Sequence, residues 1–330
     1  MAGKTGVMVF CEINDGNLAA IATEGLGIGR KLADGMGQGL AAVIIGNKIG
    51  ECAQEAISYG ADRVLVADDP LLKDYRTDAY TAVLEKLVKE NEPQVVIVGH
   101  TATGRDLAPR LAFRLGTTAT MDCIDLALEG GKLLQTKPIY GGNAQAVFSG
   151  STSPQVVTIR TKAMTPLAAD QGRKGEIVKA AAGLDAGAIR TSVLEKVKEE
   201  VEGVKLEDAE VVVAGGRGIG NADGFKQLED LAKLLKGAIG ASRPPCDNGW
   251  LAETLQIGLT GKIVAPQLYF AIGISGSSQH MSGCSGSKNI IAINKDPEAN
   301  IFREARFGVV GDWKKVLPAF TEKVKELLAG

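Results

Sequence analysis

Short runs of glycine, hydroxyl and basic residues in the second half of the chain could form a phosphate-binding surface. Residues Gly215–Gly220 follow an apolar run and hold Arg217 between glycines. Backbone amides at such a turn and a guanidinium group both donate hydrogen bonds to phosphate oxygens. The run departs from the G-x-G-x-x-G fingerprint, and no clear acidic partner closes a second strand about 20 residues later. It therefore does not predict an NAD site, and a purely structural turn is the alternative.

Two further runs place hydroxyl groups beside glycine or proline. In Gly240–Pro245, two prolines fix φ and remove two backbone donors, which predicts a rigid loop presenting Ser242 and Arg243. In Ile257–Lys262, glycines bracket Thr260 and leave its hydroxyl group and the nearby amides open to a ligand. A solvated surface arginine and a plain turn are the respective alternatives.

Polar residues also follow two later apolar runs. Residues Ile274–His280 are small or polar and end in Gln279 and His280, which is unusual for a simple connector. Residues Asn294–Ala299 and the residue Asp312 bring an amide or a carboxylate just past an apolar run, which suits ribose hydroxyls or adenine edges. Each is also an ordinary helix cap.

The elements that would position these residues alternate between strands and helices. In the first half, apolar runs predict strands at Val7–Phe10, Ala41–Ile45, Arg63–Val66, Val95–Gly99 and Val156–Ile159. Between them, Asp78–Lys89 carries apolar residues at i, i+3, i+4 and i+7, the stripe of an amphipathic helix. This alternation predicts an α/β fold with a mostly parallel sheet flanked by helices.

The second half repeats the pattern. A strand at Glu210–Ala214, the glycine turn and a helix through Phe225 and Leu235 form one nucleotide-binding half-unit. Strands at Tyr269–Ile274 and Ile290–Asn294 follow, and an amphipathic helix runs from Trp313 to Leu327. The loops after successive parallel strands would meet at one edge of the sheet.

The length of 330 residues suggests two domains at roughly 100–200 residues each. Between residues 172 and 192 the pattern fades into small residues, and a charge-rich stretch follows. We therefore expect an N-terminal domain at 1–190 and a C-terminal, Rossmann-like domain at 191–330. The segment Val193–Val204 fits either a helix or a strand.

Composition excludes several classes of protein. With 37 Lys and Arg against 39 Asp and Glu, the chain lacks the basic surface that binds nucleic acid. Its apolar runs are far shorter than the ~20 residues that span a bilayer, so we expect no membrane insertion and a cytoplasmic location. Two histidines and five scattered cysteines predict neither a metal site nor disulfides, and His100 is expected to be structural.

Five motifs, taken together in order, resemble the alpha subunit of the electron-transfer flavoprotein family. They are Gly-Gly-Arg-Gly at 215–218, Gly-Ala-Ser-Arg at 240–243, Thr-Gly-Lys-Ile-Val-Ala-Pro at 260–266, Ile-Ser-Gly-x-x-Gln-His at 274–280 and Ala-Ile-Asn-Lys-Asp-Pro-Glu-Ala at 292–299. Weaker similarity covers 102–110 and 138–143. The resemblance implies a heterodimer with a beta subunit, contacted by the N-terminal domain, and one FAD held mainly by the C-terminal domain.

The resemblance also implies the residues that line the FAD. Arg243 would approach the isoalloxazine ring, Thr260 its N5 edge and His280 its O2 side, and these three would tune the flavin. Asn294 and Asp312 would contact the adenosine half. The full set is Arg217, Ser242, Arg243, Ile257, Gly258, Leu259, Thr260, Ser275, Gly276, Ser277, Ser278, Gln279, His280, Asn294, Asp312 and Trp313.

The residue types suit a flavin, because reduction places negative charge near N1 and O2, where a cation or a donor is stabilising. The chain departs from the family at Leu259, where glutamine is usual, and at Cys246 and Asn248. We expect FAD binding to survive these changes, whereas redox potentials cannot be carried over.

The resemblance implies a redox carrier subunit that is catalytic only within a flavoprotein complex. It would accept electrons from dehydrogenases, of the acyl-CoA type by resemblance, and pass them to a quinone-linked oxidoreductase. One alternative is the alpha subunit of an NADH-dependent bifurcating complex. An alternative of another class is a non-redox scaffold that binds an adenine nucleotide, supported by fold analogy alone.

Overall fold

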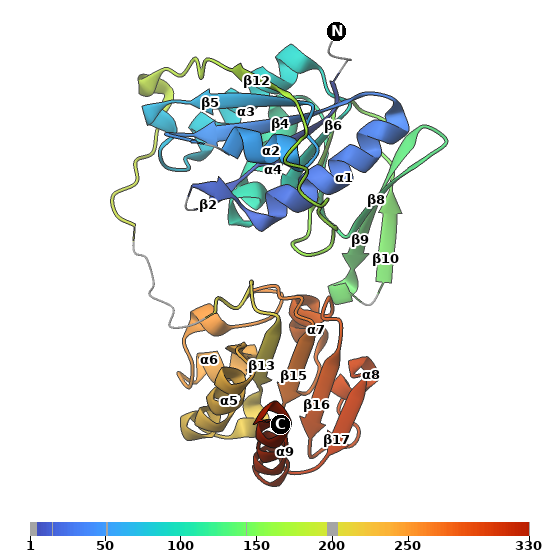
Figure 1. The fold of residues 1–330 in the computed structure, drawn as a ribbon, viewed down its shortest axis with the longest axis vertical. Helices are drawn as coiled ribbons and strands as arrows, with labels where there is room; N and C mark the ends of the chain where they lie inside the picture. Colours follow the sequence, from blue (N-terminus) through green and yellow to red (C-terminus); the bar gives the residue numbers. More distant parts are fainter. Residues whose placement is uncertain (1–4, 15, 51, 143, 197–203, 330) are drawn as a thin grey trace. The chain divides into compact units, whose positions relative to one another are not determined.

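A computed structural model describes residues 5–14, 16–50, 52–142, 144–196 and 204–329. Contacts between residues divide the chain into two units, whose helices and strands are drawn in Figure 1. Each unit has its own hydrophobic cores. The first unit comprises Met1–Pro138 and Gln145–Val197. The second comprises Ile139–Ala144 and Lys198–Gly330.

The first unit is built on a seven-stranded sheet in the order β12-β5-β4-β1-β6-β11-β7. Every neighbouring pair in it is parallel. The central strands are buried on both faces and β-branched residues dominate them, as is typical of a parallel sheet covered by helices. The strands are β1 (Thr5–Cys11), β4 (Gly39–Gly46), β5 (Arg63–Asp68), β6 (Val95–Gly99), β7 (Ala119–Cys123), β11 (Gln155–Ile159) and β12 (Glu176–Lys179).

Helices cover both faces of this sheet. α1 (Ala20–Met36) and α2 (Cys52–Ser58) pack on one face, and α3 (Thr77–Asn91) and α4 (Ala102–Arg114) pack on the other. A three-stranded sheet adds β8 (Asp125–Glu129), β9 (Lys132–Ile139) and β10 (Ala144–Phe148), and β2 (Ile13–Asn14) pairs with β3 (Asn17–Leu18). Short 3-10 turns of this unit are η1 (Pro70–Leu72) and η3 (Ala186–Ala188), whereas η2 (Tyr140–Gly142) belongs to the second unit.

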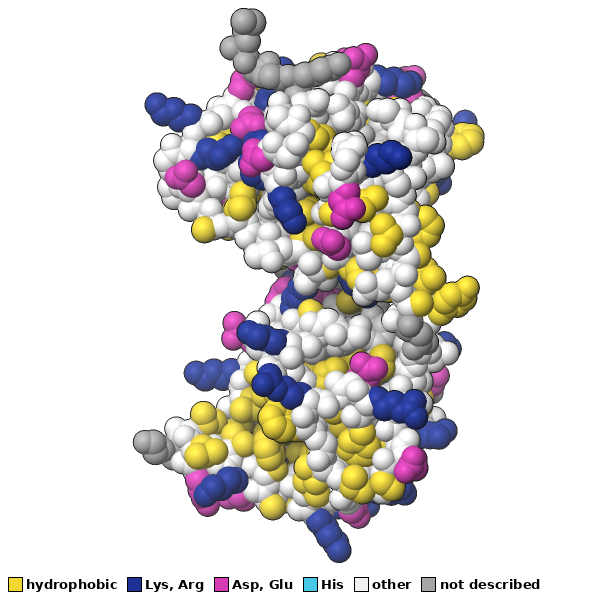
Figure 2. Space-filling model, turned by 90° about the vertical axis from the view of Figure 1, so that its right-hand side faces the viewer, with side chains coloured by type: hydrophobic (Ala, Val, Ile, Leu, Met, Phe, Trp, Pro, Cys, Tyr) yellow, Lys and Arg dark blue, Asp and Glu magenta, His cyan; other side chains and the backbone are white. Residues whose placement is uncertain are grey.

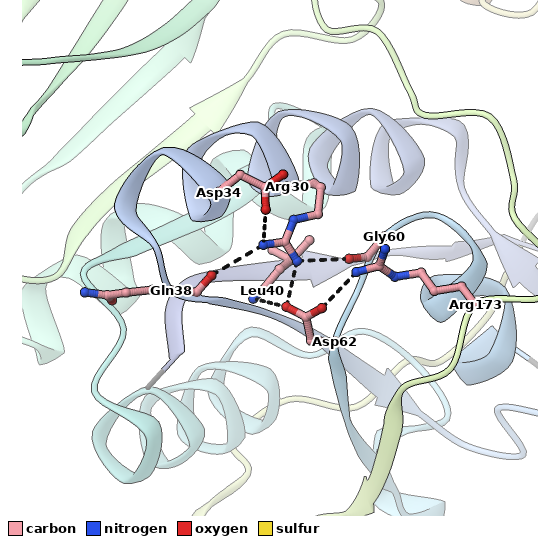
Figure 3. Close-up of polar contacts among 7 residues, drawn as sticks. All are labelled: Arg30, Asp34, Gln38, Leu40, Gly60, Asp62 and Arg173. Atoms are coloured by element: carbon pink, nitrogen blue, oxygen red, sulfur yellow. Dashed lines mark hydrogen bonds and ion pairs between the residues drawn. The ribbon is translucent and has the colours of Figure 1, made fainter. Parts of the chain in front are cut away.

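A cluster of charged residues fastens the segment before β12 to the sheet (Figure 3). The Asp62 carboxylate accepts from Arg30 Nη1 at 2.6 Å, from Arg173 Nη2 at 2.8 Å and from the Leu40 amide at 2.9 Å. Burial alone raises the pKa of Asp62, but the Leu40 amide and the two guanidinium groups outweigh it and lower that pKa overall. Asp62 therefore links α1, β4 and the segment that leads to β12.

The second unit has a five-stranded sheet in the order β14-β13-β15-β16-β17, parallel throughout. α5 (Ala222–Leu234), α6 (Arg243–Asp247) and α9 (Trp313–Ala329) contribute to the core on one face, and α7 (Ser278–Cys284) and α8 (Ile301–Glu304) to the core on the other. The strands are β13 (Val211–Gly215), β14 (Ala238–Ala241), β15 (Leu268–Ile272), β16 (Ile290–Asn294) and β17 (Phe307–Val310). The 3-10 turns are η4 (Arg217–Ile219) and η5 (Glu253–Leu255).

The predicted α/β class, with mostly parallel sheets flanked by helices, is confirmed. Each predicted strand is present, with ends that differ by up to two residues. The structure adds β12 within the stretch that the sequence pattern marked as a linker. The pattern missed this strand because Ile177 is 48% exposed and the strand shows no alternation of buried and exposed residues. The ambiguous segment Val193–Val204 falls largely on residues 197–203, outside the described residues.

The edge strand β17 was not predicted either. All four of its residues are exposed, including Phe307 and Val310, so the strand has no buried side to reveal it. Figure 2 shows hydrophobic side chains gathered on the face of the second unit that carries this edge. Among the described residues, no helix has both the length and the apolar character needed to cross a bilayer.

Candidate functional site

Four loops of the second unit leave its sheet at the same edge. Because β13, β14, β15 and β16 are parallel, the residues that follow their carboxyl ends meet there. The chain runs from β13 outward to β14 and then returns to β15 on the other side of β13. Such a reversal opens a crevice between the two loops, the usual ligand position in an open α/β sheet.

Glycines let the loops after β13 and β15 cross at backbone distance. A Cβ atom on Gly216 would lie 2.2 Å from the Gly273 carbonyl oxygen, and one on Gly218 would lie 2.9 Å from the Gly273 Cα atom. Gly273 itself has φ of 63°, which favours glycine. The glycine run at 215–220 is thus needed for a close approach of two loops.

A cavity of about 610 Å³ opens at this edge. It draws on the loops after β13, β14, β15 and β16 and on the segment before β15. Its lining consists of Arg217, Gly218, Ser242, Arg243, Pro244, Gln256, Ile257, Gly258, Leu259, Thr260, Gly273, Ile274, Ser275, Ser277, Gln279, His280, Asn294, Lys295, Asp296 and Ala299.

Most of the sequence-predicted site residues lie in this lining. They are Arg217, Ser242, Arg243, Ile257, Gly258, Leu259, Thr260, Ser275, Ser277, Gln279, His280 and Asn294. Four others lie elsewhere. Gly276 and Ser278 line a smaller cavity beside α7. Asp312 accepts from the Lys314 amide at the start of α9, and the Trp313 indole donates to the Gly218 carbonyl at 3.1 Å.

Sequence reasoning missed several lining residues, chiefly Gln256, Lys295 and Asp296. Gln256 lies just before the run at 257–262, and its Nε2 donates to Thr260 Oγ1 within that run at 2.9 Å. Lys295 and Asp296 lie inside the run that the sequence identified, where only Asn294 was selected. A search of the flanking positions in each motif would have found all three.

Two guanidinium groups supply positive charge to the cavity. Arg217 is exposed and makes no side-chain hydrogen bond or ion pair within the described part of the chain. Arg243 Nε lies 3.2 Å from Asp247 Oδ2, with both side chains more than half exposed. An exposed pair of this kind is weak, so both arginines stay available to an anion.

Two polar side chains hold the loops instead of reaching into solvent. Asn294 Nδ2 donates to the Ile274 carbonyl at 2.8 Å and its Oδ1 accepts from the Asp296 amide, which ties the loops after β15 and β16 together. His280 is 4% exposed, and both its ring nitrogens have partners inside the unit. Burial lowers the pKa of His280 to about 4, so its ring is neutral at pH 7.

Family models match both units of the chain. Residues 7–185 match the model described as the electron transfer flavoprotein domain, and residues 205–285 match the one described as the electron transfer flavoprotein FAD-binding domain. The second match includes the strands β13–β15 and most of the cavity lining.

Curated relatives match over nearly the whole length. The chain is 45% identical to the electron transfer flavoprotein subunit alpha of Thermoanaerobacterium thermosaccharolyticum and to that of Bacillus subtilis, in each case over 97% of this chain and 98% of the relative. It is 37% identical to the acryloyl-CoA reductase electron transfer subunit beta of Anaerotignum propionicum, over 97% of this chain and 95% of that one.

Proposed function

Because this chain belongs to the family of electron transfer flavoprotein alpha subunits, we propose that the cavity of its second unit holds the FAD through which the protein carries electrons. The chain has the FAD-binding domain of the family, and FAD is its cofactor. The observation that carries the assignment of the site is the pair of available guanidinium groups, Arg217 and Arg243, in a cavity at the switch point of that domain.

The residues of the cavity fit such a cofactor. The Arg217 guanidinium group and the hydroxyl groups of Ser275 and Ser277, which line the cavity, suit a pyrophosphate group. Leu259, with 60% of its surface exposed, and Pro244 offer apolar contact to a ring system. Asp296 and Lys295 offer polar groups for an adenosine portion.

When bound, FAD supplies the uptake and release of electrons. The protein's own groups adjust how readily that occurs. Arg243 would offset negative charge that gathers on the reduced ring, because a cation in a partly dehydrated cavity interacts more strongly than it does in water. Thr260 accepts from Gln256 Nε2, which leaves its hydroxyl hydrogen free to donate to the ligand. Both roles follow from charge and hydrogen-bond capacity at the cavity wall.

The family implies a beta subunit and redox partners. Our finer proposal is that electrons come from a dehydrogenase acting on acyl-CoA compounds and leave to a quinone-linked oxidoreductase, with the exchange taking place in the cytoplasm. The name of the relative from Anaerotignum propionicum, an electron transfer subunit of acryloyl-CoA reductase, supports an acyl-CoA partner.

The test uses the chain co-purified with its beta subunit. A visible flavin spectrum is expected, and an acyl-CoA dehydrogenase with its substrate should bleach it. A flavin that accepts no electrons from any such dehydrogenase would contradict the proposed partner class.

Addition of NADH to the same sample separates the simple carrier from a bifurcating complex. One FAD per heterodimer that ignores NADH supports the carrier. Two FAD molecules, with reduction by NADH, support bifurcation. A colourless protein, even after addition of FAD, would remove the electron-carrier proposal altogether.

A further inference from the structure

A buried tyrosine and a buried histidine lie behind the loop that forms one wall of the cavity. Tyr269 on β15 is fully buried, and its hydroxyl oxygen lies 3.0 Å from His280 Nε2 on α7. The other ring nitrogen, His280 Nδ1, lies 3.1 Å from the Ile257 carbonyl oxygen. The three groups form a chain from the sheet to the cavity wall.

The hydrogen-bond chemistry fixes the direction of this chain. A carbonyl oxygen can only accept, so Nδ1 must carry the hydrogen. In a neutral ring Nε2 is then an acceptor, and the Tyr269 hydroxyl donates to it. Burial favours the neutral ring, since it lowers the pKa of His280 and raises those of Tyr269 and the neighbouring Cys284 thiol. His280 thus has no ring N–H left for a ligand.

The carbonyl held by His280 belongs to the segment 257–260, which lines the cavity. On the other side of Gly258, the Leu259 amide donates to the Gln279 carbonyl at 2.7 Å. The fit against α7 is close, because a Cβ atom on Gly283 would lie 2.4 Å from the Gly258 nitrogen. The hydrogen bonds to the His280 ring and to the Gln279 carbonyl therefore fix the positions of Leu259 and Thr260.

We propose that Tyr269 is a positioning residue for the flavin-binding segment 257–260: its hydroxyl fixes His280 in the Nδ1–H form, and that form holds the Ile257 carbonyl. The inference rests on the proposed site. It replaces the expectation that His280 approaches the flavin O2 with a different role, in which His280 acts through the backbone. The segment it holds carries Thr260 and Leu259 into the cavity.

The first experiment needs no flavin. The full chain is labelled with ¹⁵N-histidine, and ring correlations are recorded, with His100→Gln used to assign the two histidines. We expect His280 to be protonated at Nδ1 and neutral from pH 8 to pH 5, with its Nε2 resonance shifted in Tyr269→Phe. A ring protonated at Nε2, or a cationic ring at pH 7, would overturn the proposal whatever the protein does with FAD.

The second experiment compares two matched substitutions of the histidine in the heterodimer. In His280→Asn the amide can take the place of Nδ1 and donate to the Ile257 carbonyl, whereas in His280→Gln the amide sits where Nε2 was. We expect FAD affinity to fall about tenfold in the Gln variant, the loss of one buried hydrogen bond, and clearly less in the Asn variant. The reverse order would mean that His280 serves the flavin directly through Nε2.

Tyr269→Phe in the same heterodimer completes the test, with Tyr80→Phe as control. Tyr80 is also buried, and its hydroxyl donates to the Leu72 carbonyl in the first unit. We expect the first variant to weaken FAD binding and shift the flavin potential, and the control to do neither. If Tyr269→Phe leaves both unchanged while the wild-type heterodimer binds FAD normally, the positioning role is wrong and the proposed function stands. Wild-type heterodimer that binds no FAD contradicts the proposed function instead.

Discussion

At the scale of single residues, Arg217 is the clearest source of charge for a cofactor. It is exposed at the crossing loops without an acidic partner in the described ranges, so removing it frees no buried group. We expect Arg217→Ala to weaken FAD binding about 10–100-fold, the worth of a hydrogen bond to a charged group. Fluorescence titration with FAD measures this. Lys226→Ala, which removes an exposed lysine on α5, should leave the affinity unchanged, and equal affinities in all three proteins would contradict the assignment.

His280 makes a prediction about pH that requires no ligand. Burial lowers the pKa of the folded histidine to about 4 from its ordinary 6.5, so the unfolded chain binds the proton first. The contribution of His280 to the free energy of unfolding is therefore fully present above pH 6.5. It is lost as the pH falls from 6.5 towards 4, by about 3 kcal/mol in total.

Urea unfolding followed by tryptophan fluorescence measures this loss, because the chain has two tryptophans, Trp250 and Trp313, both in the second unit. His280→Asn should show a shallower decline between pH 6.5 and pH 4.5. A variant as acid-sensitive as the wild type would show that His280 is not the group responsible. His100 lies in the first unit and is common to both proteins, so the comparison cancels its contribution.

At the scale of elements, the crossing of the loops after β13 and β15 tests how the glycines shape the site. Gly216 has an ordinary φ of -104°, but a Cβ there would overlap the Gly273 carbonyl. Gly220 has φ of 95° and open space around it. We expect Gly216→Ala to cost at least 1–3 kcal/mol by overpacking and to abolish FAD binding, and Gly220→Ala to cost about 1–2 kcal/mol of backbone strain. Urea unfolding and FAD titration separate the two, and equal effects on binding would argue against a steric crossing.

The Asp62 cluster makes the corresponding prediction for the first unit. Asp62→Asn should destabilise that unit by about 1–2 kcal/mol, because two guanidinium groups lose their shared carboxylate in a partly exposed setting. Asp34→Asn removes the outer and more exposed partner of Arg30 and should cost less. Since the pKa of Asp62 is lowered, its contribution is present above about pH 4 and lost as the pH falls below it. Far-UV circular dichroism during urea unfolding measures it, and equal effects of the two variants would mean that Asp62 does not bind the segment before β12 to the sheet.

Burial explains why the sequence predicted some strands and missed the edge strands β12 and β17. β6 and β16 carry β-branched residues buried by helices on both faces, so an apolar run alone identifies them. β12 and β17 are edge strands with exposed side chains, and their pairing depends on neighbours distant in sequence. The same limit applies within the site. The motif at 274–280 located His280 in the lining, but only the contacts with Tyr269 and the Ile257 carbonyl reveal that both ring nitrogens are already used.

At the scale of the whole molecule, the two units should respond separately to the cofactor. Each has its own cores, and every described residue that lines the cavity belongs to the second unit. FAD at 100 times its Kd stabilises the folded form that binds it by about 2.7 kcal/mol. We therefore expect FAD to shift the urea transition seen by tryptophan fluorescence, which reports the second unit, and to leave a second transition, seen by circular dichroism, where it was. Urea titration of the full chain with and without FAD gives both unfolding curves. A single transition that moves as a whole would contradict this, because it would show that the two units unfold as one cooperative body, which FAD stabilises as a whole.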